Sequence, residues 1–322
     1  MKRIGVLTSG GDAPGMNACI RAIVRTGASR GIEVIGIRRG YMGLLEEDVF
    51  RLGPRDVGHV LERGGTFLDS SRCEEMKTSQ GQVKAVSVLE KNSIEGLAVI
   101  GGDGSFRGAD AIAKAGEIKV MGIPGTIDND IYGTDYTIGF DTAVNTALES
   151  IDKIRDTAES HDRLFFVEVM GRSRGFIALA VGIAGGAEEI LIPEFETDLL
   201  QLAEKLRKAF EEGKTSGLVI VAEGDVPGGA KAIAEKTGWL IGREYRVVSL
   251  GHVQRGGSPT ANDRILASQL GVAAVNGLAE GIEGCMVGKI GCEIQYTPLE
   301  KSWTTLKELD ASMLEMLRIL AT

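Results

Sequence analysis

The chain has 322 residues, of which 43% are hydrophobic and 25% charged, which is typical of an enzyme with one large or two medium α/β domains. Its formal net charge is −9 and no run exceeds two Lys or Arg, which disfavours a nucleic-acid partner because a phosphate backbone requires clustered cations. No apolar run approaches the roughly 18 residues that span a membrane, and no signal-like segment follows Lys2 and Arg3, so we expect a cytoplasmic protein without membrane contact.

Two residue types give further limits. The 45 glycines exceed average usage, which suggests tight turns or close approaches of the backbone to a ligand. The cysteines form neither the short-spaced pairs of a zinc site nor a disulfide scaffold, so we expect reduced thiols. They are Cys19, Cys73, Cys285 and Cys292.

Eight short apolar runs predict buried strands, and amphipathic stretches between them predict helices. The runs cover residues 4–8, 33–37, 97–100, 119–123, 164–169, 189–192, 217–222 and 246–250. The clearest helical pattern covers residues 141–158, with Asp141 as a candidate N-cap. The alternation of strands and helices predicts an α/β fold with mainly parallel, doubly wound sheets.

Polar, glycine-rich segments follow six of the predicted strands. Ligands of such sheets bind beyond the carboxyl ends of the strands, so these segments form the candidate site. They are SGGD (9–12), GGDGS (101–105), PGTIDND (124–130), VMGR (169–172), AEGD (222–225) and GHVQRGG (251–257).

The first three segments suit phosphoryl chemistry, and each has a plainer alternative. Residues 8–15 form either a phosphate loop or a structural turn, and they match neither a Walker A loop nor GxGxxG. Asp103 either offers a hard oxygen ligand to the Mg²⁺ that accompanies ATP or caps the following helix. Asp128 and Asp130 either accept a hydroxyl proton and hold the acceptor, or form an Asx turn.

The motifs taken together resemble those of bacterial 6-phosphofructokinases over nearly the whole chain. The similar segments are TSGGDAPGMNA (8–18), GGTF (64–67) followed by Arg72, GGDGS, PGTIDND, SHDR (160–163), VEVMGR (167–172), VAEG (221–224) and LGHVQRGGSP (250–259). Agreement of eight ordered segments is far more specific than GGDG alone, which lipid and NAD kinases share in similar form.

This resemblance implies a glycolytic kinase that transfers the γ-phosphoryl group of ATP to the 1-hydroxyl of fructose 6-phosphate, giving fructose 1,6-bisphosphate and ADP. It implies two Rossmann-like, three-layer α/β/α domains with the active site in the cleft between them. Residues 1–139 and 251–303 would form the ATP-binding domain, and residues 140–250 and 304–322 the fructose 6-phosphate-binding domain. It also implies a homotetramer, because the family places Arg163 and Arg246 across a subunit boundary.

The resemblance also implies the role of each site residue. Asp128 would be the base, Asp103 would hold Mg²⁺, and Arg72 and Arg172 would stabilise the charge that develops on the transferred phosphoryl group. Thr126 completes the catalytic set. The ATP-binding residues would be Gly11, Tyr41, Arg72, Cys73, Gly102, Asp103, Gly104 and Ser105. The substrate-binding residues would be Thr126, Ile127, Asp128, Asp130, Arg163, Met170, Gly171, Arg172, Glu223, Arg246, His252 and Arg255.

Two glycines favour ATP as the phosphoryl donor. Pyrophosphate-dependent relatives tend to carry Asp in place of Gly104 and Lys in place of Gly125. The alternatives are a pyrophosphate-dependent enzyme or a kinase for another sugar phosphate, a non-catalytic regulatory homologue, which would be expected to lose Asp128 or Asp103, and a dinucleotide oxidoreductase, which would need GxGxxG.

The resemblance extends to an effector site for ADP or phosphoenolpyruvate, where this chain departs from the usual pattern. Matching residues are Arg21, Arg25, Arg155, Gly186, Glu188 and Lys214, whereas Pro54, Glu212, Thr215 and Ser216 replace residues that are usually basic. We therefore expect a weakened effector pocket.

One phenylalanine and two histidines complete the expectations. Phe176 stands where relatives commonly have Asp, and we expect it to alter helix packing without abolishing activity. His59 and His161 are interpreted as core histidines without a role.

Overall fold

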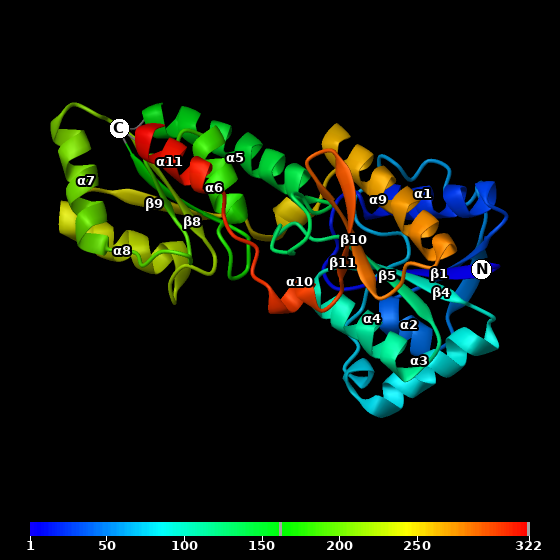
Figure 1. The fold of residues 1–322 in the computed structure, drawn as a ribbon. Helices are drawn as coiled ribbons and strands as arrows, with labels where there is room; N and C mark the ends of the chain where they lie inside the picture. The colour runs from blue at the N-terminus through cyan, green and yellow to red at the C-terminus, as the bar shows by residue number, and fades with distance from the viewer. Residues whose placement is uncertain (161–162, 321–322) are drawn as a thin grey trace. The chain divides into compact units, whose positions relative to one another are not determined.

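The computed structural model describes residues 1–160 and 163–320, so His161 lies outside the described residues. The chain divides into two compact units, Met1–Thr142 with Arg255–Lys307, and Ala143–Gln254 with Glu308–Thr322. Three crossings connect them (Figure 1). None of the described helices is long and apolar enough to cross a membrane.

The first unit contains a seven-stranded sheet in the order β11-β10-β5-β4-β1-β2-β3. Its inner strands pair in parallel, which confirms the predicted sheet type, while β3 and β11 are antiparallel. The strands are β1 (Arg3–Thr8), β2 (Glu33–Ile37), β3 (Val49–Leu52), β4 (Gly96–Gly101), β5 (Lys119–Pro124), β10 (Cys285–Ile290) and β11 (Glu293–Pro298). Sequence analysis missed β3, β10 and β11, because strands at or near a sheet edge are partly exposed and lack continuous apolar runs.

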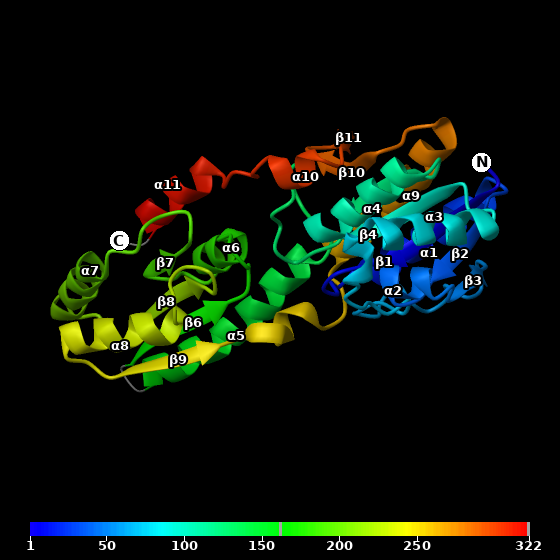
Figure 2. The same cartoon turned by 90° about the horizontal axis from the view of Figure 1, so that it is seen from below.

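Helices cover both faces of this sheet. The helices α1 (Met16–Ser29) and α9 (Ala261–Glu280) pack against each other, and α9 also contacts β4 and β5. Figures 1 and 2 show α3 and α4 side by side, and these two helices cover the other face with α2. The remaining helices are α2 (Gly40–Leu45), η1 (Glu75–Lys77), α3 (Ser79–Lys91), α4 (Asp103–Ala115) and α10 (Lys301–Thr304).

The second unit has a four-stranded sheet in the order β7-β8-β6-β9, parallel throughout. Leucine, phenylalanine and valine side chains of β6 and β8 pack with α7 and α8, and α6 contacts β7, β8 and α11. The elements are α5 (Phe140–Ser160), β6 (Leu164–Val169), α6 (Phe176–Ala184), β7 (Glu189–Leu191), α7 (Leu199–Glu211), β8 (Gly217–Ala222), α8 (Gly229–Ile241), β9 (Tyr245–Ser249), η2 (Gly251–Arg255) and α11 (Ala311–Leu320).

The amino end of α5 corrects one prediction. The helix begins at Phe140, so Asp141 lies in its first turn and is not the N-cap; its carboxylate accepts a hydrogen bond from Thr260 instead. The first amides are satisfied by Asp263 of α9, which accepts from the nitrogens of Gly139 and Thr142, each at 2.8 Å. Burial raises the pKa of Asp263, while these hydrogen bonds lower it. A cap supplied from more than 100 residues away leaves no local sequence signal.

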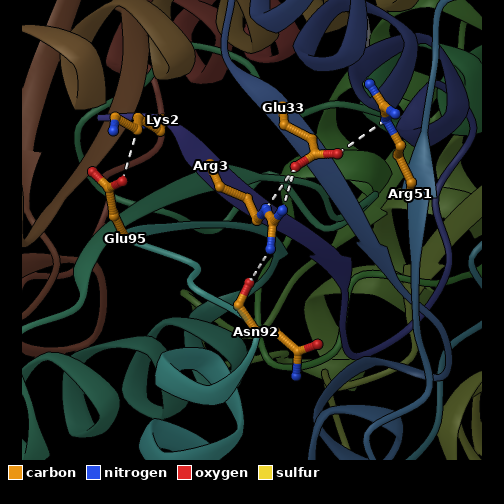
Figure 3. A network of polar contacts seen from close by, with 6 residues as sticks. All are labelled: Lys2, Arg3, Glu33, Arg51, Asn92 and Glu95. Carbon is orange, nitrogen blue, oxygen red and sulfur yellow. Dashed lines mark hydrogen bonds and ion pairs between the residues drawn. The ribbon is translucent and has the colours of Figure 1, made fainter.

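The amino ends of the large sheet carry a network of compensated charges (Figure 3). Arg3 donates to Glu33 at 2.7 Å through Nε and to the Asn92 carbonyl at 2.5 Å, and Arg51 pairs with Glu33 at 3.0 Å. The backbone nitrogen of Lys2 donates to Glu95. This network joins β1, β2 and β3 to the turn before β4, away from the glycine-rich segments.

Candidate active site

Three glycine-rich segments lie side by side at the carboxyl ends of β1, β4 and β5. After β1 the chain continues to β2 on one side, whereas after β4 it continues to β5 on the other, so the connections diverge between β1 and β4. Two backbone hydrogen bonds tie the segments together, from the Ser9 nitrogen to the Ile100 carbonyl and from the Gly125 nitrogen to the Gly101 carbonyl, both at 3.0 Å. Such a divergence point is where ligands of open α/β sheets bind.

In the first segment, the side chain of Arg255 lies against the backbone of Gly11. Gly15 adopts φ 107° and precedes α1, which begins at Met16. A Cβ atom on Gly11 would lie 2.6 Å from Nη1 of Arg255, so the guanidinium group rests against this glycine. Nε of Arg255 is buried without a hydrogen-bond partner among the described residues. Arg255 was predicted to bind the sugar substrate, and it lies beside the predicted ATP loop of the first unit.

The second segment opens α4. Gly102 is the N-cap and Asp103 the first helical residue, so the alternative of Asp103 as the cap is wrong. The carboxylate of Asp103 lies at a helix amino end, where backbone N–H groups attract anions. Ser105 is 5% exposed, and its carbonyl accepts a 2.5 Å hydrogen bond from the hydroxyl of Tyr41.

Tyr41 lies beneath this segment. Only 5% of it is exposed, its ring lies against Gly108, and burial raises the pKa of its hydroxyl. This placement supports the loop and leaves little surface for adenine, so a contact between Tyr41 and the base stays a prediction. Of its predicted neighbours, Arg72 is exposed and Cys73 partly buried, both in an irregular segment. All four cysteines are unbridged, as expected.

The third segment holds the candidate base. Asp128 is 4% exposed, and its Oδ2 accepts a 3.2 Å hydrogen bond from the hydroxyl of Thr126. That hydroxyl also accepts from the Asp128 nitrogen at 3.2 Å. Ile127 is buried beneath the turn, while Asp130 is partly exposed. The arrangement orients one carboxylate at the carboxyl end of β5.

The two glycines that favoured ATP differ in their surroundings. A Cβ atom on Gly104 would meet nothing within 4 Å, and its φ is not in the left-handed region, so the protein itself tolerates a side chain there. A Cβ atom on Gly125 would lie 2.8 Å from Ile100 and 3.1 Å from Met16. Packing alone therefore explains Gly125, and only Gly104 retains its value as an indicator of the donor.

In the second unit, four of the predicted substrate residues converge at the carboxyl ends of β6 and β8. The Arg172 nitrogen donates to the carboxylate of Glu223 at 2.8 Å, and the Glu223 nitrogen donates to the Val169 carbonyl at 2.9 Å. Gly171 has φ 146°, and a Cβ atom there would lie 2.5 Å from the Arg174 carbonyl, so glycine is required. Met170 is buried and Arg172 exposed.

Arg163 and Arg246 both lie at the opposite end of the same sheet. Arg163 directly precedes β6, and Arg246 pairs in register with Phe165 near the start of β9. The six residues of β6 span roughly 20 Å, so Arg163 and Arg172 face opposite ends of the sheet. One copy of this unit therefore places the predicted 6-phosphate clamp and the predicted stabiliser of the transferred phosphoryl group at different ends of the sheet.

Four predicted effector residues also converge within the second unit. Arg155 donates to the carbonyls of Gly185 and Gly186, and Lys214 pairs with Glu188 at 2.8 Å. Glu212 pairs with Lys208 at 3.7 Å at the end of α7, near the exposed Thr215 and the partly buried Ser216. Arg21 and Arg25 belong to α1 of the first unit.

The remaining predicted residues differ in their exposure. His252 is exposed. His59 is exposed as well, so its interpretation as a core histidine is wrong. Phe176 begins α6 and is buried, with the guanidinium group of Arg174 5.5 Å from its ring centroid. The start of α6 is therefore held by packing of an aromatic ring, at the position where relatives commonly have Asp.

The donor set fits a magnesium ion that arrives with a nucleotide. Within residues 1–160 and 163–320, no group of three or more His, Cys, Asp or Glu could hold a metal alone. Mg²⁺ is commonly bound through one or two carboxylates, with phosphate oxygens and water completing the octahedron. Asp103, beside the open space at Gly104, offers one such hard oxygen ligand.

Comparison with known sequences assigns the family. A sequence model of the family described as Phosphofructokinase matches residues 3–278. The chain belongs to the phosphofructokinase family. It is 55% identical over 321 residues to ATP-dependent 6-phosphofructokinase 1 of Thermus thermophilus, covering 100% of both chains, and 50% identical over 335 residues to ATP-dependent 6-phosphofructokinase of Halothermothrix orenii, again covering 100% of both. The resemblance inferred from the motifs is confirmed.

Solved phosphofructokinase structures share the fold. The phosphofructokinase of Saccharomyces cerevisiae matches with a TM-score of 0.87 at 35% identity, over 99% of this chain and 46% of that one, so this family member spans about half of the yeast chain. A pyrophosphate-dependent phosphofructokinase from Marinobacter aquaeolei matches with a TM-score of 0.86 at 23% identity, over 100% and 92% of the two chains, which shows the fold alone.

Sequence analysis of this phosphofructokinase missed two residues of the site. Lys307 donates to the side chain of Asn129, the residue between Asp128 and Asp130. Neither residue stands out: Asn129 lies inside the motif without a predicted role, and Lys307 is separated from it by 178 residues in the chain. Only the folded chain brings them together.

Proposed function

We propose that this protein is an ATP-dependent 6-phosphofructokinase, which transfers the γ-phosphoryl group of ATP to the 1-hydroxyl of fructose 6-phosphate in the cytoplasm. The observation that carries the proposal is the oriented, buried Asp128 beside two glycine-rich loops at the divergence point of the large sheet. The names of full-length relatives at 50–55% identity state the same activity for those proteins.

On the nucleotide side, backbone N–H groups and one cation would hold the triphosphate. The loop at Gly11 and the amino end of α4 present N–H groups, and Arg255 lies against the first loop. Asp103 would be the protein ligand of Mg²⁺, which neutralises phosphate charge when bound. Arg72 and Arg172 would stabilise the charge that develops on the transferred group.

On the acceptor side, Asp128 would take the proton of the 1-hydroxyl. The hydroxyl of Thr126 donates a hydrogen bond to this carboxylate and fixes its orientation, as a general base requires. Glu223, held by the Arg172 nitrogen, together with Met170 and Gly171, would contact the sugar. The planar guanidinium groups of Arg163 and Arg246 suit bidentate binding of its 6-phosphate.

The opposite placement of Arg163 and Arg172 supports an assembly in which each site uses two chains, as a homotetramer would provide. This is testable by mixing. We expect Asp128→Ser to be nearly inactive and Arg246→Ser to have little activity at low fructose 6-phosphate concentration. Hybrids assembled from both should regain activity at that concentration, because some sites then combine an intact Asp128 with an intact Arg246. Hybrids that stay inactive would place both residues in one chain.

The decisive experiment for the activity is a coupled assay with fructose 6-phosphate that compares ATP with pyrophosphate, each with and without Mg²⁺. We expect turnover only with ATP and Mg²⁺. Turnover with pyrophosphate would replace the donor assignment, and no turnover with either donor would overturn the function. The open space at Gly104 is the structural feature that supports ATP.

Regulation by ADP or phosphoenolpyruvate should be weak. Glu212 adds a negative charge two residues before Lys214 in the chain, which weakens attraction of an anionic effector. We expect either effector at millimolar concentration to change the half-saturating fructose 6-phosphate concentration by less than about threefold. Strong sigmoidal inhibition would contradict this expectation.

A further inference from the structure

Lys307 is a cation inside the first unit that the proposed chemistry does not use. It follows α10 and is the last residue of that unit before the chain crosses to the other. Its Nζ donates to Oδ1 of Asn129 at 2.8 Å and to the carbonyl of Asp135 at 2.7 Å. A partly buried ammonium group pays a desolvation cost, so its retention calls for a specific reason.

Asn129 is the centre of the loop that carries the candidate base. It is 4% exposed and adopts φ 55°, a left-handed conformation that asparagine tolerates. Its Oδ1 also accepts from the Thr137 nitrogen at 3.0 Å, and its Nδ2 donates to the Asp135 carbonyl at 3.2 Å. The hydroxyl of Thr137 closes the loop by donating to the Thr126 carbonyl at 2.6 Å. Lys307 therefore donates to two acceptors that also hold the loop together, Oδ1 of Asn129 and the carbonyl of Asp135.

The rest of this loop is attached to the β10–β11 hairpin. The Asp135 nitrogen donates to the Lys289 carbonyl at 2.8 Å, and the Gly291 nitrogen donates to the Asp135 carboxylate at 2.6 Å. Thr134 exchanges hydrogen bonds with the backbone of Lys289. These contacts fix residues 134–135, whereas Lys307 fixes Asn129 between the two acidic residues of the motif.

We propose that Lys307 is a positioning residue for phosphoryl transfer, which holds Asn129 in its left-handed conformation and thereby sets the orientation of Asp128 and Asp130. The inference rests on the proposed function, because it assigns Lys307 to the reaction in which Asp128 is the base. Lys307 would act through Asn129, without a contact of its own to either substrate. Loss of its two hydrogen bonds removes the charged partner of Asn129 and allows the loop to shift, and displacement of a catalytic group by about 1 Å can lower turnover about 100-fold.

The charge of Lys307 adds a second readout. Burial lowers the pKa of its ammonium group to about 8, while the nearby Asp135 and Asp130 oppose that shift. As the pH rises through about 8, Lys307 loses its positive charge, so its bonds to Asn129 and Asp135 lose their charge assistance. Arginine at this position would stay charged throughout the range.

The test compares Lys307→Met, Lys307→Arg and the control Lys301→Met, which removes an exposed lysine from α10. We would measure kcat and both KM values from pH 6.5 to 9.5, together with thermal stability. We expect Lys307→Met to lower kcat 10- to 100-fold with KM changes below about threefold, and Lys301→Met to match the wild type. The wild-type kcat should fall above about pH 8, and that decline should be absent in Lys307→Arg.

Each outcome separates the inference from the proposed function. A wild-type kcat retained within twofold in Lys307→Met overturns the role of Lys307 while leaving the kinase assignment intact. A wild-type protein inactive with ATP overturns the function itself. If Lys307→Met also lowers stability, restoration of kcat at neutral pH by Lys307→Arg supports positioning. An unchanged alkaline decline in Lys307→Arg contradicts it.

Discussion

The two ends of the seven-stranded sheet are built on opposite principles. At the amino ends, Arg3, Glu33 and Arg51 compensate one another at 2.6–3.0 Å, and Asn92 accepts the remaining guanidinium bond. At the carboxyl ends, the segments are rich in glycine, and Arg255 has a buried Nε without a hydrogen-bond partner among the described residues. Charges that are compensated within the protein stabilise it, whereas groups left for an outside partner serve binding.

The largest expected effect comes from the carboxyl end. Asp128→Ser should lower kcat about 1000-fold or more with little change in the fructose 6-phosphate KM, because a general base acts chiefly in the transition state. Steady-state kinetics with the exposed Asp152→Ser on α5 as control would measure it. Near-normal turnover of Asp128→Ser would end its assignment as the base.

A matched pair of glycine substitutions separates ligand space from packing at that same end. Gly104→Asp should fold normally and raise the ATP KM about 100-fold, because an added carboxylate enters open space and repels phosphate. Gly125→Lys should instead lower the free energy of unfolding by about 1–3 kcal/mol, because its Cβ meets Ile100 and Met16.

ATP titrations and urea denaturation of both variants would measure these effects. An unchanged ATP KM in Gly104→Asp would contradict the view that the space at Gly104 is kept for the nucleotide. A fully stable Gly125→Lys would contradict the packing explanation.

The second unit tests how general the contrast is, because its predicted phosphate clamps lie at the amino end of its sheet. Arg246 is exposed; its guanidinium group pairs with Glu244 at 3.4 Å and donates to the Tyr245 carbonyl at 2.9 Å. We expect Arg163→Ser or Arg246→Ser to raise the fructose 6-phosphate KM about 10- to 100-fold with a smaller change in kcat, from the loss of hydrogen bonds to a charged group. An unchanged fructose 6-phosphate KM would mean that substrate binding uses only the carboxyl ends of the strands.

The smallest effect on activity should come from the network in Figure 3. Arg3→Ala should lower the free energy of unfolding by about 1 kcal/mol, since the pair is partly exposed to solvent, and leave kcat and KM within twofold. Arg51→Ala, whose side chain is 78% exposed, should cost less. A loss of activity in a stably folded Arg3→Ala would show that the amino end also serves function.

Much of the fold could be predicted because the inner strands are uniformly buried. The apolar runs at 97–100 and 217–222 match β4 and β8 closely, since strands covered on both faces require continuous apolar residues. The hairpin of β10 and β11 was missed because its outer strand is partly exposed and its residues alternate irregularly. The N-cap assigned to Asp141 was wrong because the capping carboxylate comes from Asp263 on another helix.

The sequence by itself determined the family, the parallel sheets and the segments that carry the chemistry, because close backbone approach and oriented carboxylates require particular residues at particular spacings. Tertiary structure decided what lies next to what. It separated Gly104 from Gly125, put Arg255 against the first loop, and brought Lys307 to Asn129 across 178 residues. Such contacts depend on packing between segments that are distant in the chain, and a local sequence pattern does not predict them.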